Sequence, residues 1–170
     1  MSVVLIGYRG SGKSTVGKRL ADRLWQPFVD TDALIVRKAG KSIREIFEHQ
    51  GEQAFRDLES TIVRDTLKLK EHVISLGGGA LLREENRAAL KASGHKVVYL
   101  KCAPEELYKR ITADPDSADA RPDLTMEGGL EEVKNLLAAR EPTYRAAMSA
   151  ELDVTHLSPP DAVVYIVRLL

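Results

Sequence analysis

A glycine-rich segment near the N-terminus carries the residues best suited to chemistry on phosphates. It reads Gly7-Tyr8-Arg9-Gly10-Ser11-Gly12-Lys13-Ser14, which satisfies the pattern Gly-x-x-x-x-Gly-Lys-Ser. The glycines allow backbone N–H groups to surround phosphate oxygens, and the N-terminus of a following helix adds positive potential. In this pattern Lys13 reaches the terminal phosphates, and the hydroxyl of Ser14 is a ligand for Mg²⁺. We therefore expect the segment to bind a nucleotide together with Mg²⁺.

Two carboxylates follow the second apolar run of the chain. Asp30-Thr31-Asp32 comes directly after Pro27-Phe28-Val29, and we predict a strand that ends there. Parallel sheets bind ligands at the carboxyl ends of their strands, and side chains two residues apart on extended backbone point the same way. Both carboxylates then face a cleft, where one holds Mg²⁺ through water and the other accepts a hydroxyl proton from an acceptor. The alternative is that Asp30 or Asp32 only caps a helix that begins near Ala33.

Arginines and a run of glycines complete the candidate chemistry. Arg56 and Glu59 are three residues apart on a predicted helix and share a face. Either they orient each other, or they form a solvated surface ion pair that contributes little to stability. Gly77-Gly78-Gly79 follows another predicted strand, where so many glycines carry an entropic cost. We expect a ligand to approach this backbone closely, with a plain turn as the alternative. Arg121 and Arg140 add planar cationic forks that suit carboxylates and phosphates.

The elements that position these residues alternate between short β-rich runs and stretches of helical period. This order predicts an α/β fold with three layers, in which helices cover both faces of a parallel sheet. We predict strands at residues 3–6, 27–30, 73–76, 97–100 and 152–154. A helix with the apolar stripe Val16, Leu20 and Leu24 leaves the glycine loop, Pro104 opens another, and Ser158-Pro159 begins a closing helix.

Two segments depart from this simple alternation within the single domain that we expect for residues 1–170. Residues 33–70 form a longer connection than a crossover requires. They contain the capping-box pattern Ser42-Ile43-Arg44-Glu45 and then a helix over about residues 52–69, so we expect an insertion that forms one wall of a substrate-binding cleft. Residues 112–128 lack apolar periodicity and are rich in proline and aspartate, which predicts a lid loop, with an inert loop as the alternative.

The composition excludes several classes of partner. The chain has 25 basic and 25 acidic side chains and only 5% aromatic residues, so we expect no nucleic-acid surface. No apolar stretch is long enough to span a membrane, and no signal peptide is present. The single cysteine, Cys102, excludes an internal disulfide and fits a reducing compartment. We expect a cytoplasmic monomer that acts on small molecules.

Taken in order, these motifs resemble those of the shikimate kinases, P-loop enzymes that use ATP to phosphorylate the 3-hydroxyl of shikimate in aromatic amino acid biosynthesis. The resemblance covers nearly the whole chain. It rests on Gly10-Ser11-Gly12-Lys13-Ser14-Thr15, Asp30-Thr31-Asp32, the segment Gly51-Glu52-Gln53-Ala54-Phe55-Arg56-Asp57-Leu58-Glu59, Gly77-Gly78-Gly79, Arg121-Pro122 and Arg140-Glu141-Pro142-Thr143-Tyr144. The segment Gly-Glu-x-x-Phe-Arg-x-x-Glu and the triple glycine are much more specific than the phosphate loop.

The resemblance implies a nucleoside monophosphate kinase-like fold with the strand order 2-3-1-4-5, and a role for each motif residue. Asp32 would act as the base, and Lys13 and Arg121 would be the other catalytic residues. Shikimate would contact Asp32, Arg56, Glu59, Gly77, Gly78, Gly79 and Arg140. ATP would contact Gly10, Ser11, Gly12, Lys13, Ser14, Thr15, Arg110 and Arg121, with Arg110 stacked on adenine. Mg²⁺ would be held by Ser14 and, through water, by Asp30.

Two places depart from the family pattern. Tyr8-Arg9 stands where apolar or small residues are more usual, so Arg9 adds a charge near the phosphates that is expected to alter nucleotide affinity. Arg121-Pro122 continues with Asp123-Leu124-Thr125 in place of two leucines, which affects lid packing.

Two other functions remain open at this point. One is a related small kinase that acts on gluconate or a nucleoside monophosphate, and the other is a non-catalytic nucleotide-binding module. A clamp of Arg56 and Arg140 favours an acidic polyol over a nucleotide as acceptor. The presence of the acceptor residues as well as the loop argues against a non-catalytic module.

Overall fold

Five parallel strands form the centre of the protein, of which the computed structural model describes residues 1–114 and 128–170. The sheet has the order β2-β3-β1-β4-β5, which confirms the expected 2-3-1-4-5 arrangement. The strands are β1 (Val3–Ile6), β2 (Phe28–Asp30), β3 (Val73–Ser75), β4 (Lys96–Lys101) and β5 (Ala150–Asp153). Each predicted strand is present, with ends that differ by at most a few residues.

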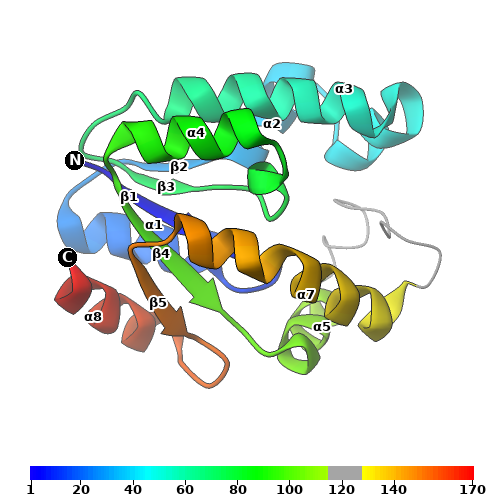
Figure 1. The fold of residues 1–170 in the computed structure, drawn as a ribbon. Coiled ribbons are helices and arrows are strands. Elements are labelled where there is room, and N and C mark those ends of the chain that lie inside the picture. Colours follow the sequence, from blue (N-terminus) through cyan, green and yellow to red (C-terminus); the bar gives the residue numbers. More distant parts are fainter. Residues whose placement is uncertain (115–127) are drawn as a thin grey trace.

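Helices cover both faces of this sheet and give the predicted three layers. Figure 1 shows α1 and α8 together on one face and α4 and α7 on the other. The helices are α1 (Lys13–Leu24), α2 (Thr31–Ala39), α3 (Ile43–Thr66), the short 3₁₀ helix η1 (Ala80–Leu82), α4 (Glu84–Ser93), α5 (Pro104–Ala113), α7 (Gly129–Ala147) and α8 (Pro159–Leu169). Within the described part of the chain, no helix is both long and apolar enough to cross a membrane.

The apolar patterns of the sequence account for these elements. Every residue of β1 is buried, as expected for a strand with helices on both sides. Val16 and Leu20 of α1 are buried against the sheet, as their spacing predicted. Pro104 occupies the first turn of α5, and the side chain of Ser158 accepts a hydrogen bond from the Asp161 N–H at 3.2 Å to cap α8. Local sequence and tertiary packing therefore agree at these positions.

The connection between β2 and β3 forms the predicted helical insertion. The capping box is present: Ser42 accepts from the Glu45 N–H at 3.1 Å, and the Glu45 carboxylate accepts from the Ser42 N–H at 2.7 Å. Gly51, at φ 85°, interrupts α3, so that a second straight section begins near the predicted position and ends at Thr66. The insertion has its own apolar cluster, formed by Ile35, Ile43, Ile46, Phe55 and Ile62.

Two boundaries differ from those predicted, and one helix contains an interior proline. α2 begins at Thr31 and not near Ala33, and α5 continues to Ala113, into the start of the predicted loop. The helix that carries Arg140 runs through Pro142 and ends at Ala147. On the same helix, the centroid of the Tyr144 ring lies 5.1 Å from that of Tyr99. Arg121, Asp123-Leu124-Thr125 and most of the predicted lid lie outside the described residues.

Candidate active site

The loop between β1 and α1 borders a cavity of about 970 Å³, a volume suited to a small-molecule ligand. Gly12 is the N-cap of α1 and adopts φ 93°, a conformation that favours glycine. The Nζ of Lys13 donates to the carbonyls of Gly7 at 2.7 Å and Tyr8 at 2.9 Å. All six loop residues expected at a nucleotide line the cavity: Gly10, Ser11, Gly12, Lys13, Ser14 and Thr15. The predicted phosphate cradle is thus an open, accessible feature of the fold.

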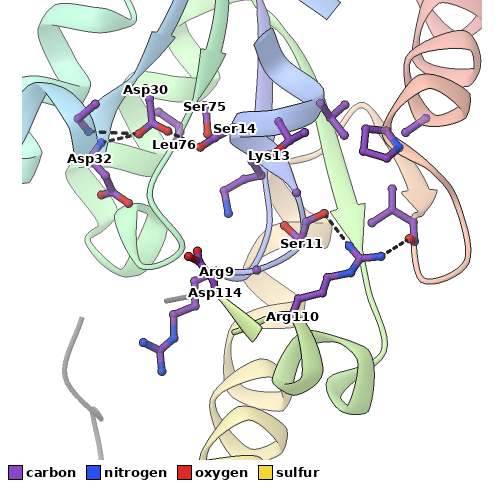
Figure 2. Close-up of a pocket in the computed structure, with 18 of the residues that line it drawn as sticks. Arg9, Ser11, Lys13, Ser14, Asp30, Asp32, Ser75, Leu76, Arg110 and Asp114 are labelled. Atoms are coloured by element: carbon purple, nitrogen blue, oxygen red, sulfur yellow. Dashed lines mark hydrogen bonds between the residues drawn. The ribbon is translucent and has the colours of Figure 1, made fainter. Parts of the chain in front are cut away.

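Arg110 borders the same cavity at its other end. Its guanidinium donates to the Val154 carbonyl at 3.0 Å and to the Ser11 carbonyl at 3.4 Å, so it links α5 to both the phosphate loop and the segment after β5 (Figure 2). Apolar side chains of the segment after β5 and of the start of α8 complete this end of the cavity: Val154, Leu157, Pro159 and Ala162. A flat arginine beside apolar groups is a suitable surface for a planar base.

Asp30 connects the phosphate loop to the insertion. Its carboxylate accepts hydrogen bonds from the Ser14 hydroxyl, from the Asp32 N–H at 2.9 Å and from the Ala33 N–H at 3.3 Å. Asp30 is therefore the N-cap of α2, as one alternative predicted, and the same carboxylate also contacts the hydroxyl that is expected to bind Mg²⁺.

Asp32 lines the cavity, but for a different reason from the one predicted. The expected extended backbone from Asp30 to Asp32 is wrong, because Asp32 lies in the first turn of α2. The Asp30 cap fixes that turn, and Figure 2 shows both carboxylates on the same side of the cavity as Ser14. The side chain is half-buried and its Oδ1 is enclosed, so only part of the carboxylate is accessible to an acceptor.

The oxygen atoms of Ser14 and Asp30 fit the ligand preference of Mg²⁺. They are hard ligands on adjacent elements that border the phosphate cradle. The part of the chain that the structure describes contains no cluster of three or more His, Cys, Asp or Glu side chains that could hold a metal. Mg²⁺ in phosphoryl-transfer sites commonly uses one or two protein oxygens with phosphates and waters, so this small donor set is sufficient.

Arg56 and Glu59 form a buried pair and not a solvated surface pair. The Arg56 Nη1 lies 2.6 Å from the Glu59 Oε1, and the two residues are only 8% and 1% exposed. Burial raises the pKa of Glu59, while Arg56 and, more weakly, Arg140 act in the opposite direction. Arg56 also lies 3.7 Å from the exposed Glu52 carboxylate, so two carboxylates of the same helix hold its guanidinium in place.

The triple glycine is required by the protein's own side chains. A Cβ at Gly77 would lie 2.7 Å from the Asp32 Oδ1 and 3.1 Å from the Glu59 Oε2, and a Cβ at Gly79 would lie 2.6 Å from the Arg56 Nη2. At Gly78 a Cβ would lie 3.1 Å from the Arg9 backbone nitrogen. The absence of side chains here lets the carboxylates, the arginine and the phosphate loop converge. The near neighbours that the structure identifies are protein atoms, and the expected approach of a ligand to this backbone stays a prediction.

Two residues that position this region were not singled out from the sequence. The Thr31 hydroxyl accepts from the Gly77 N–H at 3.1 Å, and the Tyr144 hydroxyl donates to the Gly78 carbonyl at 2.5 Å. Arg140 is buried on the same helix as Tyr144. The signal was present in both motifs, because Thr31 separates the two aspartates and Tyr144 follows Arg140 by about one helical turn.

Comparison with known proteins identifies the family. A family model described as shikimate kinase matches residues 9–170. A shikimate kinase from Enterococcus faecalis is 39% identical over 169 residues, which cover 99% of this chain and 98% of the relative. One from Rhodopirellula baltica is 44% identical over 152 residues, or 89% of this chain and 81% of the relative. The solved shikimate kinase from Acinetobacter baumannii in complex with shikimate has a TM-score of 0.91 and 34% identity, and the match covers 99% of this chain and 91% of that one. The chain therefore belongs to the shikimate kinase family of enzymes.

Proposed function

We propose that this chain transfers the γ-phosphoryl group of ATP to the 3-hydroxyl of shikimate, with Asp32 as the general base. The observation that carries this proposal is the convergence of Asp32, Glu59 and Arg56 on the glycines that follow β3. A carboxylate base beside a buried cationic clamp suits an acceptor that has both a hydroxyl and a carboxylate. The solved relative from Acinetobacter baumannii, which has shikimate bound, supports the same acceptor.

The proposed step needs one proton transfer and one displacement. Asp32 takes the proton of the 3-hydroxyl while that oxygen attacks the γ-phosphorus. The new O–P bond forms as the bond from the γ-phosphorus to the bridging oxygen breaks, which leaves ADP. The ammonium of Lys13, at the mouth of the phosphate loop, offsets negative charge on the β- and γ-phosphate oxygens. Arg121 is proposed as a further cation at these phosphates, from the family resemblance alone.

Arg56 and Arg140 are proposed to grip the shikimate carboxylate, with Glu59 as the residue that orients Arg56. The backbone of Gly77, Gly78 and Gly79 would lie against the ring. The chain is proposed to act as a monomer. Residues 33–70 are proposed to form the acceptor-binding wall, and residues 112–128 a lid. The single cysteine, Cys102, fits a reducing compartment, which is proposed to be the cytoplasm.

Substrate profiling tests the proposed acceptor. Formation of ADP is measured with shikimate, gluconate and nucleoside monophosphates at equal concentration. We expect shikimate to stimulate ADP formation by a large factor over ATP alone, and the other compounds to give rates close to background. A higher rate with gluconate or a nucleotide would replace shikimate by that acceptor, and tight ATP binding with no acceptor-dependent rate would indicate a non-catalytic module.

Removal of Mg²⁺ is expected to abolish turnover. Mg²⁺ when bound would be held by the Ser14 hydroxyl and, through water, by Asp30, and it neutralises phosphate charge and aligns the phosphates. Excess EDTA should reduce ADP formation to background, and added Mg²⁺ should restore it. Ser14→Ala should require a higher Mg²⁺ concentration for half-maximal rate. A full rate in EDTA would contradict the assignment.

Replacement of Gly79 by alanine is expected to raise the KM for shikimate by roughly tenfold. The backbone of Gly79 (φ −103°, ψ 6°) accepts an alanine, so the main conflict is the 2.6 Å approach of the new Cβ to the Arg56 guanidinium. Gly94→Ala is the control, because no atom lies within 4 Å of its Cβ position and only backbone strain at φ 66° results. It should lower the Tm without a change in KM. An unchanged KM in Gly79→Ala would separate Arg56 from acceptor binding.

A further inference from the structure

Two adjacent residues of the phosphate loop contact the same side of α7. The Arg9 Nη2 lies 3.5 Å from the Glu132 Oε2, and the Arg140 Cζ lies 5.5 Å from the centroid of the Tyr8 ring. Glu132 and Arg140 are about two helical turns apart, at a spacing that places both on one side of a helix. Tyr8 and Arg9 are the pair that departs from the family pattern. We call the four side chains of Tyr8, Arg9, Glu132 and Arg140 the loop–helix cluster.

The loop–helix cluster is buried and electrostatically connected. Glu132 and Tyr8 are each 1% exposed, and Arg140 is 7% exposed. Burial raises the pKa of the Tyr8 hydroxyl; Arg9 and then Arg140 oppose this shift, and Glu132 adds to it. All three charged groups thus lie close enough to Tyr8 to act on it. The burial of a carboxylate such as that of Glu132 costs free energy that a nearby cation offsets, and Arg9 supplies one.

The Arg9 side chain extends from the phosphate loop toward α7. Figure 2 shows the Arg9 side chain directed away from Lys13 and from the inner surface of the phosphate loop. Its guanidinium instead meets a carboxylate in the first turn of α7. Arg9 thus borders the cavity, but its guanidinium pairs with Glu132, which offsets the charge that Arg9 adds to the loop.

Arg140 lies between two anchors of α7. On its N-terminal side, Glu132 ties the first turn to Arg9, while the N-cap residue Gly128 offers no side-chain cap. On its C-terminal side, Tyr144 donates to the Gly78 carbonyl. Between these anchors, the Arg140 guanidinium lies over the Tyr8 ring, a contact that limits its orientation.

We propose that the Arg9–Glu132 ion pair is a positioning device for the acceptor, which holds the first half of α7 against the phosphate loop so that Arg140 keeps the orientation that grips the acceptor carboxylate. The inference rests on the proposed role of Arg140 as part of the carboxylate clamp. It assigns Arg9, a residue of the nucleotide loop, to acceptor binding. Arg9 and Glu132 act through Arg140 and are positioning residues.

Steady-state kinetics of Arg9→Met and Glu132→Gln test the inference, with shikimate and ATP varied separately. Each variant should raise the KM for shikimate by roughly tenfold, with a much smaller change in the KM for ATP and in kcat. The double variant should resemble the single variants, because both remove the same interaction. Arg9→Lys keeps the charge and should recover much of the affinity.

Arg145→Met is the matched control, since it removes two other ion pairs of an α7 arginine. Arg145 is exposed and lies 3.0 Å from Glu141 and 3.2 Å from Glu151, away from the loop–helix cluster. Its kinetic constants should equal those of the parent enzyme. Circular dichroism and thermal melts of every variant establish that each is folded. If Arg9→Met is poorly folded, Tyr8→Leu keeps a buried apolar side chain, removes the ring below Arg140, and should raise the same KM.

Several outcomes would overturn the inference. A rise in the KM for ATP alone would assign Arg9 to the nucleotide, and a rise for Arg9→Met without one for Glu132→Gln would mean that Arg9 acts directly. A lower Tm with both KM values unchanged would leave the pair a purely structural role. Arg140→Met distinguishes the role of Arg140 in the carboxylate clamp from the positioning role of Arg9 and Glu132. If it raises the KM for shikimate while Arg9→Met and Glu132→Gln do not, the clamp stands and the positioning role fails; if Arg140→Met has no effect, the clamp itself fails.

Discussion

Replacement of Asp32 by asparagine is expected to lower kcat for shikimate phosphorylation by about 10²- to 10⁴-fold, the usual contribution of a general base. Asparagine has the same shape as aspartate but cannot accept the hydroxyl proton. The turn that carries residue 32 should persist, because the Asp30 carboxylate bonds to the backbone N–H of Asp32 and not to its side chain. ATP affinity, measured by calorimetry, should change little. The rate is measured by coupled ADP formation at saturating substrates.

Asp65→Asn is a suitable control for that experiment. Asp65 is an exposed acid that pairs with Lys68 at 2.8 Å, near the end of α3. Its removal should leave kcat and both KM values at the parent level. A near-normal kcat for Asp32→Asn would eliminate Asp32 as the base, while equal loss of ATP binding and turnover would indicate a structural role in the cavity.

Replacement of Arg56 by lysine is expected to raise the KM for shikimate by about 10- to 100-fold. Lysine keeps a positive charge beside the buried Glu59, so the insertion should remain folded. It loses the planar fork that can donate two hydrogen bonds to a carboxylate. A hydrogen bond to a charged group contributes about 1.5–3 kcal/mol, and each 1.4 kcal/mol corresponds to about tenfold in affinity. Initial rates over a range of shikimate concentrations give the KM, with calorimetry as a direct measure of affinity.

Arg44→Lys provides the matched substitution on the first section of α3. Arg44 is exposed and pairs with Glu48 at 2.8 Å on the surface. The same change of side chain there should not alter the KM for shikimate. If Arg56→Lys also leaves this KM unchanged, the acceptor carboxylate binds elsewhere. If it raises the KM for ATP instead, the clamp serves the nucleotide.

The phosphate loop and the sheet were predictable because each depends on local sequence. The spacing of Gly12, Lys13 and Ser14 defines a loop conformation, and buried apolar runs define parallel strands. The capping box at Ser42 likewise identified a helix start from four residues. These features are determined by residues close together in the chain, and the structure has them where the sequence places them.

Other features depend on long-range packing, which spacing alone does not reveal. Helical period shows that Arg56 and Glu59 share a face but not which face is buried. The glycines at 77–79 signal a close approach without naming the approaching atoms, which are those of Asp32, Glu59, Arg56 and the phosphate loop. The continuation of α7 through Pro142 and the contact between Arg9 and Glu132 also arise between distant segments.

The most direct test of the central claim is the identity of the phosphorylated product. The enzyme is incubated with Mg²⁺, ATP and shikimate, and the products are analysed by phosphorus and proton NMR. We expect one ADP for each phosphorylated shikimate, with the phosphate on the oxygen at position 3. Phosphate on a different hydroxyl would contradict the proposed placement of Asp32. Release of inorganic phosphate in place of a shikimate ester would contradict the proposed transfer itself.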